Sequence, residues 1–284
     1  MACAQAVGSP PGRVVLVDAG PGSVDLLTLR AARLLAEADW VVHDALVQPE
    51  VLALATRARM VDVGKRAGRP SMQQARINRT LVDCARAGGL VVRLKGGDPL
   101  LFARAREELD ALRAAGIEVE VVPGITAAQA AHAALGLPMT ERRQRRAMVL
   151  ATPQAARSVV PGPDAGREAD DLHWARALVN AGGGALYMAA TAVARVRAIL
   201  LSLGLSADTP ATWMVDASLP SQATVATTLG ALAPLPAMLS GRPAILLLGA
   251  GNGHTPASDY RAPSRDSTRV ALQARDPLTT PRIR

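Results

Sequence analysis

The chain has 284 residues, of which 49% are hydrophobic and 20% charged, with a formal net charge of +8 at pH 7. This length and hydrophobic content allow two domains with sizeable cores and exclude a largely disordered chain. Aromatic residues make up only 2% of the chain, which argues against nucleic-acid binding, because such modules commonly stack bases on aromatic side chains. We therefore attribute the basic charge to a solvated surface or to a small polyanionic substrate, and expect no nucleic-acid partner.

No apolar run reaches the roughly 20 residues that span a membrane, and the N-terminal residues lack the charged start and apolar block of a signal peptide. Cys3 and Cys84 form neither a disulfide framework nor a metal motif. The four histidines lack the spacing of metal ligands: His43, His132, His173 and His254. We expect a cytoplasmic protein without membrane contact or a bound metal.

In chain order, the hydrophobic periodicity of the first half predicts alternating strands and helices. The predicted strands cover residues 13–17, 40–43, 60–63, 90–94 and 118–122, and the predicted helices 23–35, 71–87, 103–115 and 126–135. Ser23 and Ser71 are predicted to cap the first two helices, and Gly88, Gly116 and Gly136 to end the later three. Repeated βα units predict a mostly parallel sheet covered by helices, in an N-terminal α/β domain over residues 13–138. Residues 1–12 are predicted to be a disordered tail.

A basic, proline-containing segment over residues 139–146 shows no clear period and is the predicted linker. A second α/β domain is predicted over residues 147–250, with a loop at 161–170. Its predicted strands are 147–151, 185–188, 211–215, 223–226 and 244–248, and its predicted helices 171–180, 192–203 and 228–232. Residues 251–284 are predicted to be a disordered basic tail. The sequence thus predicts an α/β fold of two α/β domains with an active-site cleft between them.

Three glycine-containing turns each follow a predicted strand. They are Gly96-Gly-Asp98, Ala19-Gly-Pro-Gly22 and Val122-Pro-Gly-Ile-Thr126. Glycine permits tight turns and a close approach of the backbone to a ligand, and ligands of open α/β sheets bind at the carboxyl ends of strands. We therefore predict that the three turns form one shared ligand site.

One alternative follows from the first turn alone. Gly20-Pro-Gly22 followed by Asp44 superficially matches a dinucleotide-binding fingerprint. However, Asp25 stands three residues after Gly22, where the third glycine is expected, and Pro21 stiffens the turn. A nicotinamide-dependent dehydrogenase is therefore an alternative that this pattern supports poorly.

A longer set of motifs resembles the uroporphyrinogen-III C-methyltransferases of the tetrapyrrole methylase superfamily, over residues 13–249. The most specific motif is Arg93-Leu-Lys-Gly-Gly-Asp-Pro99. The others occur in the same order as in the family: Gly20–Gly22, Asp25–Leu29, His43–Val47, Val63–Arg66, Pro123–Ala127 and Tyr187-Met188. The resemblance implies a homodimer that binds S-adenosylmethionine between two α/β domains. It also implies methylation of the tetrapyrrole uroporphyrinogen III at C2 and C7 to precorrin-2, for siroheme or cobalamin synthesis.

The same resemblance implies roles for particular residues. Asp44 corresponds to the family's proposed proton acceptor and Lys65 to its proposed proton donor, while Arg66 and Arg104 are assigned to substrate binding. The implied cofactor contacts are Pro21, Gly96, Gly97, Asp98, Leu101, Thr126, Ala127, Met188 and Ala217. Taken singly, Met188 also fits a core residue, Thr126 a helix cap, and Asp44 a rim salt bridge with Lys65 or Arg66.

The chain departs from the family's usual motifs in several places. Asp18 and Ser23 flank the first turn where the family has Gly and Asp, and residues 102–108 lack three of the family's glycines. Further departures lie at 152–154, 215–217 and 249–251. They leave open a non-catalytic or retuned paralogue that binds S-adenosylmethionine or a tetrapyrrole. Asp18 itself is expected either to face the cofactor's cation or to pair with a nearby basic residue.

Overall fold

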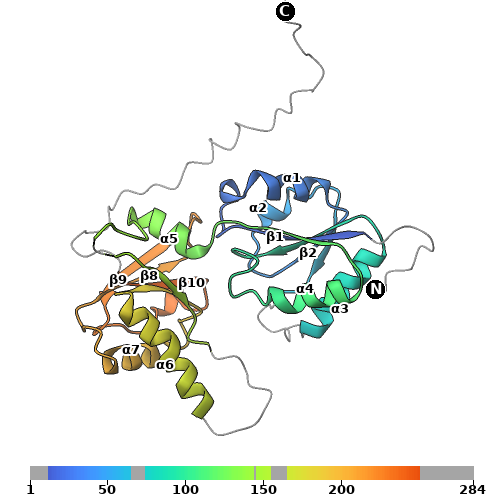
Figure 1. Cartoon of the computed structure of the whole chain (residues 1–284). Helices are drawn as coiled ribbons and strands as arrows, with labels where there is room; N and C mark the ends of the chain where they lie inside the picture. The colour runs from blue at the N-terminus through green and yellow to red at the C-terminus, as the bar shows by residue number, and fades with distance from the viewer. Residues whose placement is uncertain (1–11, 65–73, 144, 155–164, 250–284) are drawn as a thin grey trace, which may run out of the picture.

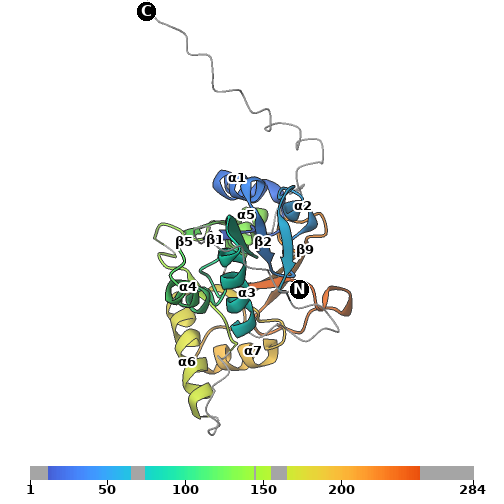
Figure 2. The same cartoon turned by 90° about the vertical axis from the view of Figure 1, so that its right-hand side faces the viewer.

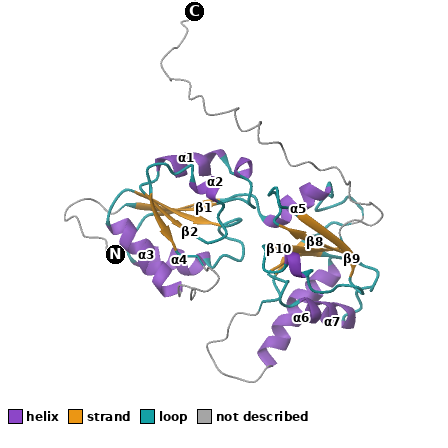
Figure 3. Cartoon of the chain, turned by 180° about the vertical axis from the view of Figure 1, so that it is seen from behind, coloured by secondary structure: helices purple, strands orange, loops and turns teal. Residues whose placement is uncertain are grey.

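The computed structural model describes residues 12–64, 74–143, 145–154 and 165–249. These residues form two lobes that lie side by side in Figures 1 and 3, each built on a five-stranded sheet with helices on its faces. The predicted α/β fold class is confirmed. The predicted tails at 1–12 (except Gly12) and 251–284 lie outside the described residues, as do Lys65, Arg66 and Ser71.

The first sheet is entirely parallel, with strand order β3-β2-β4-β1-β5. Its strands are β1 (Arg13–Asp18), β2 (Trp40–His43), β3 (Arg59–Asp62), β4 (Leu90–Lys95) and β5 (Val119–Val122). This confirms the mostly parallel sheet predicted for the first half. Because all five strands run in one direction, their carboxyl ends lie along one edge of the sheet.

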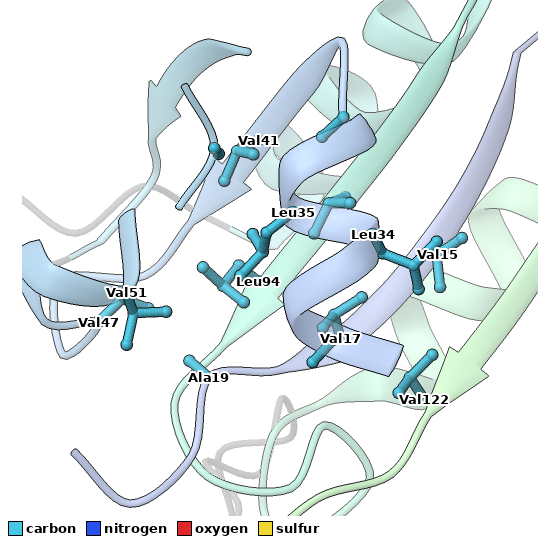
Figure 4. Close-up of a cluster of buried hydrophobic side chains, with 14 of the residues drawn as sticks. Val15, Val17, Ala19, Leu34, Leu35, Val41, Val47, Val51, Leu94 and Val122 are labelled. Carbon is cyan, nitrogen blue, oxygen red and sulfur yellow. The ribbon is translucent and has the colours of Figure 1, made fainter. Parts of the chain in front are cut away.

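Helices cover both faces of this sheet (Figure 1). One face carries the short 3-10 turn η1 (Val24–Leu26), α1 (Leu29–Glu37) and α2 (Pro49–Leu52), and the other carries α3 (Gln74–Arg86) and α4 (Ala105–Ala114). Alternate residues of a strand point to opposite faces, so Val15 and Val17 pack under α1 while Leu16 packs toward α3 and α4. Figure 4 shows Leu34 and Leu35 of α1 directed onto this strand core.

Two helix starts differ from the prediction. The helix predicted from Ser23 begins at Leu29, where Thr28 caps it by accepting the Ala31 N–H at 3.1 Å. Ser23 instead precedes the 3-10 turn η1 without a side-chain capping bond, and its backbone N–H donates to Ser218 of the other lobe. The helix predicted from residue 103 begins at Ala105, because Phe102 and Arg104 adopt positive φ angles that a helix excludes. Gly116 and Gly136 end their helices at positive φ, as predicted.

The second sheet is mixed, with strand order β6-β7-β10-β8-β9. Its strands are β6 (Val149–Ala151), β7 (Gly184–Tyr187), β8 (Pro210–Val215), β9 (Ala223–Thr228) and β10 (Ala244–Leu248). Strands β6 and β7 pair in parallel, whereas the other pairs are antiparallel. Helices α6 (Ala165–Asn180) and α7 (Val193–Ser202) pack on one face and α5 (Ala127–Leu135) on the other, with the 3-10 turn η2 (Ala237–Leu239) before β10. The core of this lobe therefore includes α5, which precedes the boundary predicted at residue 138.

Two predictions in the second lobe are wrong. Helix α6 begins at Ala165, inside the predicted loop, because the helix-breaking Pro161 and Pro163 both precede its first residue. Residues 228–232 form no helix: Thr228 ends β9, and the N–H groups of Leu229 and Gly230 donate to Thr209 O and Ala207 O. Leu229 and Leu232 of this segment are buried in the core that α6 and α7 share.

Figure 2 presents the molecule turned by 90°, with the first lobe in front of the second. Among the helices in the described residues, none has the length and hydrophobicity needed to cross a membrane.

Candidate active site

The three glycine turns meet at the carboxyl edge of the first sheet. Strands β4, β1 and β5 are neighbours, and hydrogen bonds join the turns that follow them. The Gly97 N–H donates to Gly20 O at 3.0 Å, and the Gly124 N–H donates to Asp98 Oδ2 at 3.1 Å. The predicted meeting of the three turns is confirmed, while their role in ligand binding stays a prediction.

The turn after β4 leaves open space around its second glycine. Gly97 has φ +68°, a conformation that favours glycine, and a Cβ built on it would meet nothing within 4 Å. The other Asp98 oxygen, Oδ1, accepts the Leu100 N–H at 2.8 Å, and the Leu101 N–H donates to Asp98 O. The Asp98 carboxylate is thus fixed between its own turn and the turn after β5, and it remains partly exposed.

The second lobe contacts the first turn directly. A Cβ on Gly22 would lie 2.8 Å from the Leu219 side chain and 3.2 Å from Ala217 O. The Ser23 N–H also donates to Ser218 Oγ at 3.0 Å. The turn that contains Pro21 therefore packs against residues 217–219, so predicted cofactor contacts from both lobes lie in one region.

Tyr187, at the end of β7, makes two kinds of contact: its hydroxyl joins β7 to the start of α5 within the second lobe, and its ring contacts the first lobe. Its Oη lies 2.5 Å from Thr126 Oγ1 and accepts the Ala128 N–H at 3.1 Å. The Phe102 ring packs on it with centroids 5.1 Å apart. Burial raises the pKa of Tyr187 above its usual value, so the phenol stays neutral and hydrogen-bonded. Tyr187 was not among the predicted site residues, although the Tyr187-Met188 pair was part of the recognised pattern.

The single-residue interpretations of Thr126 and Met188 are now separable. Thr126 caps α5, and its N–H donates to Gln129 Oε1 at 3.0 Å, so the cap interpretation is correct whatever else Thr126 does. Ala127 is the first residue of this helix. Met188 directly follows β7 and its side chain is 48% exposed, so the core interpretation is wrong.

Strained backbone gathers in the loops near these contacts. Of the six non-glycine residues with positive φ in the described part of the chain, five lie between β4 and α4, after β7 and after β8: Phe102, Arg104, Met188, Asp216 and Ser218. Such conformations cost on the order of 1–3 kcal/mol each and are found preferentially at functional sites. The Asp216 carboxylate accepts from Arg242 and from Ser221 Oγ at 2.8 Å, which fixes the loop after β8.

Asp44 follows β2 and belongs to a cluster of charged side chains beneath the rim. Arg93 Nη2 donates to Asp44 Oδ1 at 2.7 Å and to Glu108 Oε1 at 3.1 Å, while Lys95 Nζ donates to Glu108 Oε2 at 2.7 Å. The Asp44 side chain is 33% exposed, whereas Arg93, Lys95 and Glu108 are buried. Burial, followed by the charge of Arg93, lowers the pKa of Lys95.

The salt bridge considered for Asp44 therefore exists, but its partner in the described residues is Arg93, while Lys65 and Arg66 lie outside them. Sequence reasoning missed the cluster, although a signal was available. Arg93 and Lys95 alternate within a strand that is otherwise apolar and buried, and charged residues are rarely buried unless paired.

Arg104 lies on the exposed side of this region. Its guanidinium donates two hydrogen bonds of 2.7 Å to the Glu107 carboxylate. This pairing raises the pKa of Arg104 above its usual value. Both side chains are exposed, so the pair can exchange with an incoming anion.

Asp18, the last residue of β1, is fully buried. Its Oδ1 accepts the Gly20 N–H at 2.5 Å, and within the described residues its Oδ2 has no hydrogen-bond partner. Burial raises the pKa of Asp18 to about 7, the Asp98 charge adds to this, and the backbone amides of Gly20 and Ile125 oppose it. No basic residue in the described part of the chain pairs with Asp18, so the structure does not bear out the expected ion pair there.

Comparison with known proteins adds an independent observation. The family model for tetrapyrrole (corrin/porphyrin) methylases matches residues 13–233. The chain is 41% identical over 233 residues to the uroporphyrinogen-III C-methyltransferase of Paracoccus denitrificans, which covers 80% of this chain and 78% of that protein. It is 40% identical over 246 residues to the siroheme synthase of Baumannia cicadellinicola, covering 85% of this chain and 50% of the relative. The chain thus spans about half the length of the siroheme synthases that it matches.

Among solved structures, the chain is similar to the uroporphyrin-III C-methyl transferase of Thermus thermophilus in complex with S-adenosylhomocysteine. The TM-score is 0.69 at 36% sequence identity, and the match covers 84% of this chain and 97% of that one. The similarity therefore extends over both lobes.

Proposed function

Since this chain belongs to the family of tetrapyrrole (corrin/porphyrin) methylases, we propose that it is a uroporphyrinogen-III C-methyltransferase that uses S-adenosylmethionine. The proposed reaction transfers two methyl groups, to C2 and C7 of uroporphyrinogen III, and yields precorrin-2 and S-adenosylhomocysteine. One observation carries this proposal: three strand-end turns are joined around Gly97 and Asp98 in a chain that is 41% identical to a protein of this name.

The residues at these turns fit the proposed cofactor, which supplies an electrophilic methyl group on a sulfonium. The open space at Gly97 allows a ligand to approach the backbone, and a partly exposed carboxylate such as Asp98 suits the cationic amino group of an amino acid. The remaining proposed contacts come from both lobes: Pro21, Gly96, Leu101, Thr126, Ala127, Met188 and Ala217. We propose that the cofactor lies between the lobes, where these residues converge.

Methyl transfer from a sulfonium to carbon is an in-line displacement, so most of the catalysis is the positioning of two ligands. The protein also has to move a proton. In the proposed mechanism, the Asp44 carboxylate accepts a proton from the substrate near its ring nitrogens, and Lys65, outside the described residues, donates one. Asp44 is suitably placed for this role, because it follows a strand at the carboxyl edge and is one-third exposed.

The substrate is a polyanion with eight carboxylates, which suits a basic site. Arg66 and Arg104 are the proposed partners of these carboxylates, since a guanidinium binds a carboxylate as a fork. For Arg104 this requires exchange of the Glu107 carboxylate for a substrate carboxylate. We further propose a cytoplasmic homodimer that serves siroheme or cobalamin synthesis.

The decisive experiment is incubation of the purified chain with uroporphyrinogen III and isotopically labelled S-adenosylmethionine, followed by mass spectrometry of the tetrapyrrole. Two labelled methyl groups on the product are expected. Cofactor binding without any transfer would instead identify a non-catalytic paralogue, and a product with one methyl group would restrict the enzyme to the first step. Light scattering of the same sample tests the homodimer.

A further inference from the structure

Three buried charged side chains, Arg93, Lys95 and Glu108, form a cluster with the partly exposed Asp44. We propose that Arg93 is a positioning residue that holds the Asp44 carboxylate at the edge of the site, and that Glu108 fixes Arg93 for this task. The inference rests on the proposed function, in which Asp44 exchanges a proton with the substrate.

The guanidinium of Arg93 has no freedom left, because each of its five N–H groups has an acceptor. The Nε–H and one Nη2–H donate to Glu108 Oε1, both at 3.1 Å. The Nη1 group donates to the backbone oxygens of Val42 and Leu94 at 3.4 and 3.3 Å. The remaining Nη2–H donates to Asp44 Oδ1 at 2.7 Å, the shortest bond of the set. Because the other four N–H groups hold the guanidinium in place, the fifth fixes the position of the Asp44 carboxylate.

The charges of the cluster also favour this arrangement. Arg93 and Lys95 are the cations and Glu108 and Asp44 the carboxylates, so the four charges cancel. Glu108 is buried on α4 and places one oxygen on each cation, which leaves Arg93 short of one negative partner. Asp44 supplies it, and a buried cation without such a partner would be strongly unfavourable. The attraction between Arg93 and Asp44 neutralises the buried cation and holds the Asp44 carboxylate against the sheet.

Only one oxygen of Asp44 is used in this way. Within the described residues, Oδ2 of Asp44 makes no hydrogen bond, and the side chain is the one member of the cluster that solvent reaches. The structure thus presents a carboxylate with one oxygen fixed by Arg93 and one oxygen free for a ligand. Small displacements of such a group are expected to matter, because misplacement of a catalytic group by about 1 Å can lower a rate about 100-fold.

The test compares Arg93→Met with Lys95→Met. Each variant removes one buried cation and leaves the cluster with the same net charge, but only Arg93→Met removes a contact with Asp44. Both are made in the parent chain and in Asp44→Asn, and kcat and KM for uroporphyrinogen III are measured together with cofactor affinity by calorimetry.

Arg93→Met is expected to lower kcat by about 10- to 100-fold, with KM and cofactor affinity within about threefold of the parent. In the Asp44→Asn background the same change is expected to lower kcat no further, because a residue that acts through Asp44 has nothing left to position. Lys95→Met is expected to change kcat by less than about threefold. Equal losses from Arg93→Met in both backgrounds, or an equal loss from Lys95→Met, would overturn the proposal.

A second variant covers the case in which Arg93→Met does not fold. Arg93→Lys keeps the charge but cannot donate to Glu108, the backbone and Asp44 together, so a smaller loss of kcat with the same dependence on Asp44 is expected. If the parent chain transfers no methyl group, the proposed function fails, and crystal structures decide the positioning role separately. Asp44 must then be displaced in Arg93→Lys and unmoved in Lys95→Met; an unmoved Asp44 in Arg93→Lys would refute it.

Discussion

The carboxyl of Asp18 occupies the space that a side chain at position 124 would need. A Cβ built on Gly124 would overlap Asp18 Oδ2, and Asp18 is fully buried at the end of β1. The Gly124 N–H in turn donates to Asp98. Gly124 thus links the buried acid Asp18 to Asp98 of the proposed cofactor turn.

This relationship predicts a compensating pair of substitutions. Gly124→Ala is expected to lower the free energy of unfolding by about 1–3 kcal/mol, because the added methyl group overpacks the site. Adding Asp18→Gly removes the overlapping carboxyl, so Gly124→Ala is expected to lower stability much less in that background. Urea denaturation of the parent, both single variants and the double variant measures the coupling. Strictly additive effects would mean that the two positions relax independently.

The raised pKa of Asp18 predicts a pH dependence of stability. The pKa of Asp18 is about 7 in the folded chain against 3.8 for an unperturbed aspartate, so between these values the folded state keeps a proton that the unfolded state releases. This contribution to stability is complete below the unfolded pKa and is lost as pH rises toward 7, by at most about 1.4 kcal/mol per pH unit.

Asp18→Asn cannot titrate and keeps an oxygen for the Gly20 N–H. Its stability relative to the parent is therefore expected to increase from pH 5 to pH 7 and to change little above pH 7. Denaturation curves of both proteins at pH 5, 6, 7 and 8 give this difference. A constant difference across the series would show that Asp18 does not titrate in this range.

The first and last residues of helices and strands were predicted well where the local hydrophobic pattern alone decides them. Strands β2 and β10 were predicted to the residue, because each is a short and largely buried run of mostly apolar residues. The prediction failed where a distant contact decided: Ser23 is drawn to Ser218 of the other lobe, and the segment after Thr228 pairs its backbone with residues before β8. Such partners cannot be read from local periodicity.

The same distinction applies to the site. The meeting of the three turns could be predicted, because strand-end turns of a parallel sheet share an edge. The ion pair of Asp44 with Arg93 could not, since the two residues are far apart in sequence and Arg93 lies within a buried strand. Tyr187 was missed for a related reason, because its partners Thr126 and Ala128 lie at the start of α5, far from it in the sequence.

The open space at Gly97 predicts an effect on cofactor affinity that is separate from stability. Gly97→Val places a branched side chain in that space and strains a residue at φ +68°. Gly116→Val is a matched control, because Gly116 has φ +69°, equally open surroundings, and a place after α4, before β5 begins. Both variants are expected to lose similar stability, but only Gly97→Val is expected to lose binding of S-adenosylmethionine in calorimetry. Unchanged affinity in a folded Gly97→Val protein would remove this turn from the site.

The Tyr187 hydroxyl predicts a contribution to the stability of the second lobe, because its hydrogen bonds join β7 to the start of α5. Tyr187→Phe keeps the ring that packs on Phe102 but removes the acceptor of the Ala128 N–H and the partner of Thr126 Oγ1. Loss of such partly buried hydrogen bonds is expected to lower stability by about 1–3 kcal/mol. Thermal unfolding measures it, and a midpoint equal to that of the parent would show that water replaces the phenol.

The role of Asp44 gives the last prediction. Asp44→Asn keeps the size of the side chain and an oxygen for Arg93 but removes the base, so turnover is expected to fall by about 10²- to 10⁴-fold, the usual contribution of a general acid or base. Cofactor affinity is expected to persist, because Asp44 lies on the turn after β2 and not on the three joined turns. Asp110→Asn is the matched control: Asp110 is also a carboxylate paired with an arginine, at 2.8 Å from Arg106, but it lies on the exposed surface of α4. Single-turnover methylation of uroporphyrinogen III compares the three proteins. Equal rates in Asp44→Asn and Asp110→Asn would leave Asp44 as a salt-bridge residue of the rim, because a proton acceptor cannot be replaced by an amide without loss.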